Sequence, residues 1–399
     1  MKKAFKYILY TTIILGSCQN YDKQQIDFIY EDQEINNNFC DTISIDIPSI
    51  DSDNFIKTQF DIENVCSRFE TIPLETTKES IIGNIDKVIF NDSLIFIGDF
   101  FIQKAIFVFN KSGHFIRKIS KQGKGPGEYR LNIRNFWIDE LNQIIYIVDT
   151  DRSQIIYTDF EGNLLKQKSN KIFGSDFYEN FNDSIMFFYV NGRKNLGLLK
   201  NLGLENNEEY NLYTIINGGI RKKYFPIKSE NTILFTSNNN FYPFNNQLFF
   251  RPTYDNKIYQ FNQDGQLLCK YFFQFHNYKN FEKSIWYPKV KNVNSLIGTI
   301  RAQKDHISIS RFDINKNHLL IHAICNRYGF NILYNKRTGA IHYGLAGYVN
   351  SFGVIVGFNN DCLVFSKDYR VTSINKKSNS SNSNNSENIN PTLIFGYLK

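Results

Sequence analysis

Alanine is scarce in this sequence, which contains six alanines among 399 residues but 37 phenylalanines and 24 tyrosines. The strongest helix former is therefore nearly absent, whereas residues that suit a pleated, half-buried surface abound. This imbalance argues against an all-helical fold. Because hydrophobic residues make up 42% of the chain and charged residues 21%, the composition also argues against global disorder.

Long apolar runs and enzyme motifs are missing as well. No internal run approaches the ~20 apolar residues that a membrane-spanning helix needs. The sequence has no H-E-x-x-H, no G-x-S-x-G, no paired carboxylate motif and no dinucleotide fingerprint. No sequence motif therefore indicates an enzyme class, and no cofactor is predicted.

Cysteine is sparse, and its spacing fits neither a zinc site nor a disulfide framework. The six cysteines form no C-x-x-C pair. Apart from Cys18, we expect them to be small buried hydrophobic residues, with one long-range disulfide as an open and unassigned alternative; they are Cys40, Cys66, Cys269, Cys325 and Cys362.

The N-terminus has the layout of a secretion signal. Lys2, Lys3 and Lys6 precede the apolar stretch Tyr7–Leu15, which is too short to span a membrane. Leu15-Gly16-Ser17-Cys18 then resembles the lipobox of bacterial lipoproteins, although a chance match is the alternative. We therefore predict a signal peptide at 1–17, lipid on Cys18 and a polar stalk over 18–40, in a protein held at the cell envelope through its lipid.

The predicted processing also bears on possible partners. Removal of 1–17 takes away three lysines and no acid, so the formal charge falls from +7 to +4. The basic residues are scattered rather than gathered on one face, which argues against a nucleic-acid partner. We expect the outer membrane as the location, and the sequence leaves open which face of it.

The most informative pattern is a repeated phrase of an apolar strand, a polar turn with glycine and a second strand. Its turn glycines are separated by 49, 56, 47 and 74 residues and are Gly113, Gly162, Gly218, Gly265 and Gly339. Periods near 50 with several short strands each are typical of propeller blades. The first two blades are predicted with strands at 85–90, 94–98, 105–110 and 115–120, and at 136–139, 144–149, 155–160 and 163–167.

The ends of the chain complete the predicted ring. Strands at 352–358 and 362–366 begin a last blade, which the C-terminal run 393–398 and an early strand at 69–74 would close. The sequence thus predicts an all-β, six-bladed β-propeller over 41–399 with a composite closing blade. Two interruptions are expected, an insertion at 281–304 with a helix over 294–304, and a low-complexity loop at 376–390 (KKSNSSNSNNSENIN).

Two segments resemble a known family. Phe69–Phe90 followed by Ile95–Asp99, and the loop Lys121–Tyr129 (KQGKGPGEY) followed by Trp137–Asp139, are similar to the six-bladed β-propeller lipoproteins of the Bacteroidetes. That family resembles NHL-type propellers. The resemblance implies a fold and a cell-envelope location, and it implies little about chemistry.

Candidate site residues lie near the predicted loops. Glu128 and Tyr129 either cap the glycine loop or reach toward the mouth of the channel. Asp149, Asp151 and the adjacent Arg152 follow a predicted strand, as Asp99 does in the first blade. Such acids either bind a hard cation such as Ca²⁺ or accept hydrogen bonds from backbone amides in the turn.

Aromatic clusters are the last candidate. Most of them are expected to fill the gaps between blades, but Trp286 and Tyr287 fall in the insertion and are predicted to contact a ligand. The resulting hypothesis is a binding or scaffolding propeller for a glycan, a peptide or a protein, acting through one face and the insertion. The alternative is an NHL-like hydrolase or lyase with a metal in the central channel.

Overall fold

The computed structural model describes residues 40–399 apart from 56, 150, 153, 170–175, 180–184, 190–209, 217–218, 227–239, 246, 254, 263–264, 281–301, 327, 347–351, 360 and 368–388. One short helix, α1 (Ile62–Val65), and 26 strands are present in this part of the chain. The expectation of an all-β fold is therefore confirmed. The predicted signal, lipid site and stalk up to residue 39, the insertion at 281–301 and most of the loop at 376–390 lie outside the described residues.

The described strands form six sheets, which we number in chain order. Sheet 1 contains β3 (Lys87–Phe90), β4 (Leu94–Asp99), β5 (Ala105–Asn110) and β6 (Phe115–Ile119). Sheet 2 contains β7 (Asn135–Asp139), β8 (Ile144–Asp149), β9 (Gln154–Asp159) and β10 (Leu164–Ser169). Sheet 3 contains β11 (Asp176–Glu179), β12 (Ile185–Tyr189), β13 (Tyr210–Ile216) and β14 (Gly219–Pro226).

The remaining sheets each include a strand from elsewhere in the chain or a short extra strand. Sheet 4 contains β15 (Phe241–Phe244), β16 (Gln247–Phe250), β17 (Lys257–Phe261), β18 (Leu267–Phe275) and β1 (Asp41–Ile45). Sheet 5 contains β19 (Lys279–Asn280), β20 (His306–Ile314), β21 (His318–Cys325), β22 (Tyr328–Asn335) and β23 (Ile341–Ala346). Sheet 6 contains β24 (Val354–Asn359), β25 (Cys362–Lys367), β26 (Thr392–Leu398) and β2 (Cys66–Pro73).

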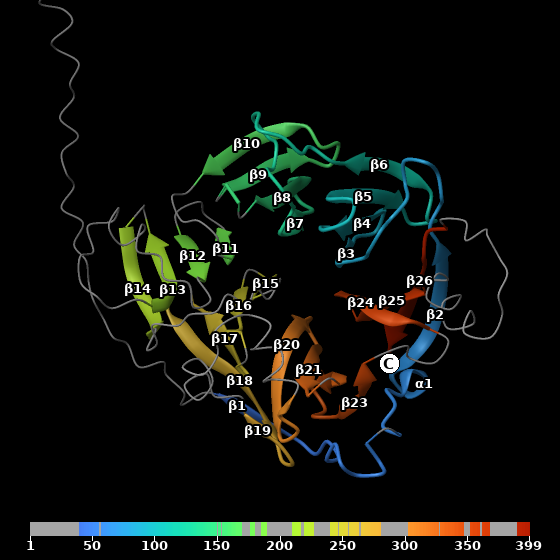
Figure 1. Ribbon diagram of the computed structural model, residues 1–399, viewed down its shortest axis with the longest axis vertical. Coiled ribbons are helices and arrows are strands. Elements are labelled where there is room, and N and C mark those ends of the chain that lie inside the picture. The colour runs from blue at the N-terminus through green and yellow to red at the C-terminus, as the bar shows by residue number, and fades with distance from the viewer. Residues whose placement is uncertain are drawn as a thin grey trace, which may run out of the picture.

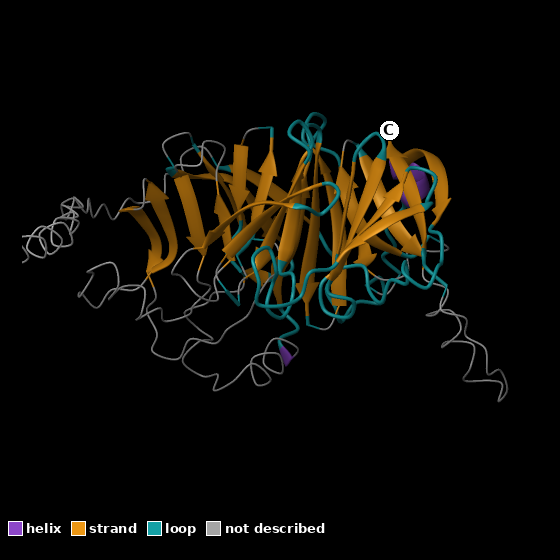
Figure 2. Cartoon of the chain, turned by 90° about the horizontal axis from the view of Figure 1, so that it is seen from above, coloured by secondary structure: helices purple, strands orange, loops and turns teal. Residues whose placement is uncertain are grey.

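The sheets follow one another around a central axis, which is the arrangement of a β-propeller (Figure 1). The strands nearest the axis are β3, β7, β11, β15, β20 and β24. Seen edge-on, the ring is a disc whose strands cross its thickness and whose loops leave from the two faces (Figure 2). The strands predicted for the first two blades match β3–β6 and β7–β10 to within two residues at each end.

Glycine sets the turn between the last two strands of successive sheets. Gly113, Gly162, Gly265 and Gly339 all have φ between 70° and 86°, a backbone conformation that strains any residue with a Cβ. Gly218, the remaining member of the predicted series, lies outside the described residues. The repeat therefore marks the same local turn in each sheet where it is described.

The N-terminal segment passes along three consecutive sheets before it enters sheet 1. β1 pairs parallel with β18 of sheet 4. The chain then passes sheet 5, where the amide of Leu345 donates to the carbonyl of Thr58 at 3.0 Å, and reaches sheet 6 as β2. We call residues 40–74 the N-terminal belt, and Figure 1 shows it in blue along the outside of the ring.

The ring is closed by pairing between the two ends of the chain. β2 runs antiparallel to β26, from the Cys66–Leu398 pair to the Pro73–Thr392 pair, and β26 in turn pairs with β25. The predicted composite closing sheet is therefore confirmed. Asn390, just before β26, is 3% exposed and donates to the carbonyls of Glu75 (2.8 Å) and Ser80 (2.7 Å), which fixes the end of the belt.

A disulfide holds the beginning of the belt. Cys40 is bonded to Cys269 in β18, whereas Cys66, Cys325 and Cys362 are free and buried. The expectation of buried cysteines is confirmed for these three. The long-range disulfide that the sequence left unassigned is the one between Cys40 and Cys269.

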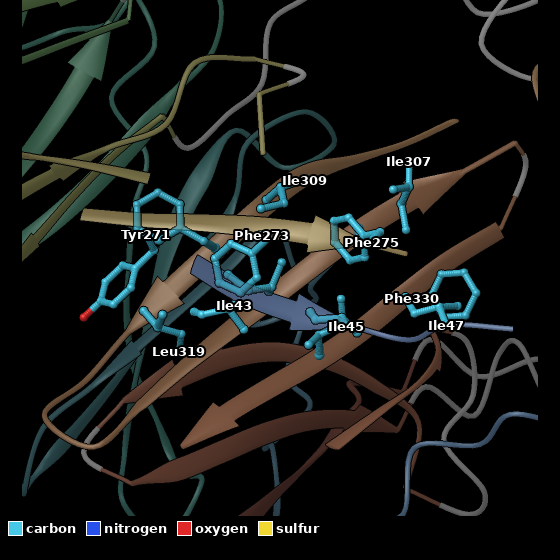
Figure 3. Close-up of a cluster of buried hydrophobic side chains, with 14 of the residues drawn as sticks. Ile43, Ile45, Ile47, Tyr271, Phe273, Phe275, Ile307, Ile309, Leu319 and Phe330 are labelled. Atoms are coloured by element: carbon cyan, nitrogen blue, oxygen red, sulfur yellow. The ribbon is translucent and has the colours of Figure 1, made fainter. Parts of the chain in front are cut away.

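The hydrophobic core consists of layers between neighbouring sheets. β18 alternates buried side chains with partly buried or exposed ones, as a period of two requires, and presents Tyr271, Phe273 and Phe275 to one such layer. The belt adds Ile43, Ile45 and Ile47, and sheet 5 adds the residues on the facing side (Figure 3). Each fully buried Phe or Ile stabilises the fold by about 2 kcal/mol. The aromatic residues of the described strands mainly fill these layers, as predicted.

Helix α1 is four residues long, and no helix among the described residues is long and apolar enough to span a bilayer.

Deletion of 391–399 is expected to unfold the ring or to lower its melting temperature by more than 10 °C, since it removes β26, leaves β2 without a partner strand and exposes one edge of β25. Deletion of 376–388, a polar low-complexity segment, is the matched control and should leave the melt nearly unchanged. Asn390 must be retained in that control because its side chain fixes the belt. Equal thermal melts for the two deletions would contradict ring closure by β26.

Candidate functional site

The predicted loop residues meet at the junction of sheets 1 and 2. The loop at 121–131 connects β6 to β7, and Oε2 of Glu128 accepts a hydrogen bond from the amide of Gly125 at 2.6 Å. A Cβ at Gly123 would collide with the Glu128 carboxylate, which explains glycine at that position. Tyr129 is 1% exposed and its hydroxyl donates to the carbonyl of Lys104.

Asp149, at the end of β8, fixes the other side of this junction. It is fully buried, and its carboxylate accepts from the amides of Arg130 (3.0 Å), Asp151 (3.0 Å) and Arg152 (3.2 Å). The side chain of Gln154 donates a further hydrogen bond at 3.1 Å. These are the turn hydrogen bonds that the sequence suggested as the alternative to cation binding.

Arg152 and Asp99 complete this structural arrangement. The guanidinium of Arg152 donates to the carbonyls of Lys124 (2.8 Å) and Glu128 (3.3 Å), so it ties the glycine loop to sheet 2. Asp99, at the end of β4, accepts from four backbone amides at 2.7–3.0 Å. Asp151 is exposed on the same turn.

The structure thus brings five predicted site residues together but uses most of their polar atoms to hold the loop. Tyr129 and Asp149 are buried, and they make the capping and turn hydrogen bonds that the sequence offered as the alternative to ligand contact. Ligand contact by Glu128, Asp151 and Arg152 stays a prediction. Trp286 and Tyr287 lie outside the described residues, as does Cys18.

A second polar cluster, which the sequence did not predict, lies on the axis. Lys87 (β3) donates from Nζ to Oδ1 of Asn135 (β7) at 2.9 Å. Nε of Arg311 lies 3.0 Å from Oδ2 of Asp313, both in β20. Tyr242 (β15) donates to the carbonyl of Phe358 (β24) at 3.5 Å. We call Lys87, Asn135, Tyr242, Arg311 and Asp313 the axial cluster.

The contacts themselves place this cluster at the axis. Sheet 5 lies between sheets 4 and 6, so the hydrogen bond from Tyr242 to Phe358 joins the innermost strands of two sheets that are not neighbours. Lys87 of sheet 1 likewise interacts electrostatically with Arg311 and Asp313 of sheet 5, which is not its neighbour. Lys87, Asn135, Tyr242 and Arg311 are all partly exposed on innermost strands, so water reaches them along the axis.

The electrostatics of the cluster favour neutral side chains. Loss of hydration, aided by the positive charge of Arg311, lowers the pKa of Lys87 to about 7, although Asp313 opposes the shift. Burial and the nearby Asp313 raise the pKa of Tyr242. Burial and Arg311 lower the pKa of His322, on β21, to about 4. At neutral pH the phenol and the imidazole are therefore uncharged, and the amine of Lys87 is about half protonated.

Only a weak sequence signal marks these residues. Lys87, Arg311 and Asp313 are charged residues within strands, and a charged side chain in a strand is ordinarily expected at the surface. Their meeting depends on how the sheets close into a ring. Among the described residues, no three His, Cys, Asp or Glu side chains are grouped to hold a metal ion.

A surface hollow of about 380 Å³ lies between sheets 1 and 2, apart from both clusters. Leu94, Val108 and Phe160 contribute apolar lining, and Asp92 and Glu140 are on its rim. Burial, with the nearby Asp92, raises the pKa of Glu140. Arg117, also in the lining, pairs with Glu161 at 3.1 Å, which partly offsets the negative charge.

The fold and the axial cluster define a β-propeller with a polar centre, and comparison with known proteins agrees with the fold. The family model named "Domain of unknown function (DUF4934)" matches residues 42–395, so the chain belongs to the DUF4934 family. No curated protein matches this sequence.

Solved structures are similar to this chain at low sequence identity, and the first of them shares its fold. A candidate exported protein from Bacteroides fragilis NCTC 9343 is 15% identical with a TM-score of 0.69, over 90% of this chain and 99% of that chain. A member of the DUF4221 family from Bacteroides vulgatus ATCC 8482 is 11% identical with a TM-score of 0.48, over 84% and 97%. Virginiamycin B lyase from Staphylococcus aureus is 13% identical with a TM-score of 0.36, over 75% and 81%.

Asp149→Ala is expected to lower the free energy of unfolding by about 3 kcal/mol, because it leaves several buried donors without an acceptor. Asp151→Ala is the matched control on the same turn, and its effect should stay within about 0.5 kcal/mol. Denaturant unfolding monitored by tryptophan fluorescence measures both. Similar losses for the two variants would show that Asp149 does not hold the junction.

Proposed function

We propose that this protein is a lipid-anchored β-propeller of the cell envelope that acts in binding or scaffolding. The single observation that carries the binding role is the axial cluster. Four of the six sheets contribute a polar side chain to it, and several of these side chains are partly exposed to water. A ring packed only for stability has no need of a lysine and an arginine at its centre, where removal from water is costly.

The finer description belongs to the same proposal. The six sheets of the described strands support a six-bladed propeller, and the sequence resemblance of Phe69–Phe90 and Lys121–Tyr129 supports its NHL-like character. The signal-like segment and Leu15-Gly16-Ser17-Cys18 support export and lipid attachment at Cys18. The fold is shared with a candidate exported protein of Bacteroides fragilis, which agrees with a location at the envelope, in the outer membrane.

The proposed ligand is a glycan, a peptide or a protein, reached from one face of the ring, and no nucleic acid is expected. Glu128, Asp151, Arg152 and the Trp286-Tyr287 pair of the insertion are proposed as further contacts. No observation on the described residues favours the metal-dependent hydrolase or lyase over the binding role.

Cys18→Ser is expected to release the protein from the membrane fraction and to leave an unprocessed precursor, because the thiol is the proposed site of lipid attachment. Cell fractionation and mass measurement of the N-terminus test this, with Cys66→Ser as a control that should remain membrane-bound. If the Cys18 variant still sediments with membranes at the mature mass, the lipid anchor is wrong.

Binding at the axis is tested with the full-length Cys18→Ser protein, which lacks the proposed lipid, on a panel of envelope glycans and peptides. At least one class of ligand is expected to bind and to be recovered chemically unchanged, with Arg311→Gln weakening it tenfold or more. Recovery of a cleaved product would favour the enzyme alternative. Binding that is insensitive to every residue of the axial cluster would refute the axis as the binding site.

A further inference from the structure

Arg311 has unused hydrogen-bond donors at the axis. Its Nε faces Asp313 at 3.0 Å, and its side chain is 31% exposed. The two terminal nitrogens of the guanidinium have no hydrogen-bond partner among the residues that the structure describes. An arginine edge with free donors and access to water is suited to a planar, two-oxygen acceptor.

Lys87 lies across the axis from Arg311 with its hydrogen bonds nearly complete. Its Nζ donates to Oδ1 of Asn135 at 2.9 Å and to the carbonyl of Phe136 at 2.8 Å. A neutral amine has two N–H groups, and both are used here. Protonation adds a third donor, for which the described residues provide no acceptor.

We propose that the axial cluster binds one carboxylate group of an acidic ligand, with Arg311 and protonated Lys87 as its direct contacts. This inference rests on the proposed function, since it names the chemistry of the ligand at the same site. The carboxylate would supply the acceptor that the terminal nitrogens of Arg311 and the third donor of Lys87 lack.

The charges of the cluster favour a monoanion. With Lys87 protonated, two cations face the single carboxylate of Asp313, which leaves one positive charge to be neutralised. A phosphate dianion would bring one excess negative charge close to the buried Asp313. A carboxylate also matches the flat edge of a guanidinium, which a tetrahedral anion fits less well.

Binding is coupled to a proton. Free Lys87 has a pKa of about 7, and a bound carboxylate raises it because an adjacent negative charge favours the ammonium form. The ligand therefore binds more tightly below pH 7 and more weakly above it. If only the protonated form binds, affinity falls about tenfold between pH 6 and pH 8.

The other titratable groups near Lys87 do not reverse this sign. Tyr242 on β15 and His322 on β21 are neutral throughout this range because their pKa values lie above and below it. β24, which packs against β3, has no titratable side chain. On the neighbouring elements, Asp86 and Asp99 accept backbone hydrogen bonds, and Asp139 of β7 is bonded to Asn142.

The carboxylate has two sources, an acidic sugar or the C-terminus of a peptide, and the probes distinguish them. Galacturonate is compared with its uncharged methyl ester, and an N-acetylated tripeptide with its C-terminal amide. Calorimetry or chemical-shift titration of the full-length Cys18→Ser protein at pH 6 and pH 8 measures binding. At least one acid is expected to bind ten times more tightly than its neutral partner, and about tenfold more tightly at pH 6.

Variants with matched controls assign the contacts. Arg311→Gln should weaken the acid probe tenfold or more at both pH values, and Lys87→Met should abolish the difference between them. Lys118→Met, on the outer strand of the same sheet as Lys87, and Arg337→Gln, on an exposed turn of the same sheet as Arg311, should change neither quantity. If a variant fails to fold, the pH profile of the unsubstituted protein still decides.

Each result bears on the proposal in a definite way. Equal binding of acid and neutral probes, with sensitivity to Arg311→Gln, overturns the carboxylate but leaves the axial binding site intact. Binding that does not change with pH overturns the role of Lys87. Failure of both acids to bind at millimolar concentration overturns the carboxylate, while the wider panel separately tests whether the protein binds at the axis at all.

Discussion

Pairing of β2 with β26 is the interaction on which the rest of this structure depends. A ring of sheets joined only in sequence order has two open ends, and each end presents unpaired backbone groups. Here β2, the last strand of the belt, enters the sheet built by the last strands of the chain, so neither end is free. The interlayer cores and the axial cluster form only once all the sheets are held in a closed circle.

Much of this architecture could be predicted from the sequence because its causes are local. A glycine with positive φ, such as Gly113 or Gly162, fixes each turn, and the alternation of apolar residues fixes which face of each strand is buried. The closing strand was also predictable, since an incomplete last blade needs a partner. The parallel addition of β1 and the disulfide at Cys40 had no local signal.

The axial cluster could not be predicted for a different reason. Lys87 and Arg311 are far apart in the sequence, and they meet because two sheets that are not neighbours face each other across the centre. The acids that the sequence offered as site residues were easy to identify, but the structure uses them to hold turns. Asp149 is conspicuous in the sequence because it ends a strand, and that same position commits it to capping the turn. At the matching position in sheet 4, Arg251 instead donates to the carbonyls of Ile309 and Ser310 and links two sheets.

The disulfide between Cys40 and Cys269 has a mechanical consequence. If the protein is held to a membrane through its N-terminus, any pull on the ring is delivered to the belt at Cys40. A noncovalent outer strand would peel away one hydrogen bond at a time under such a load. The covalent bond instead passes the force into β18, a strand with a partner on each side, so β2 and the closure of the ring are shielded from tension.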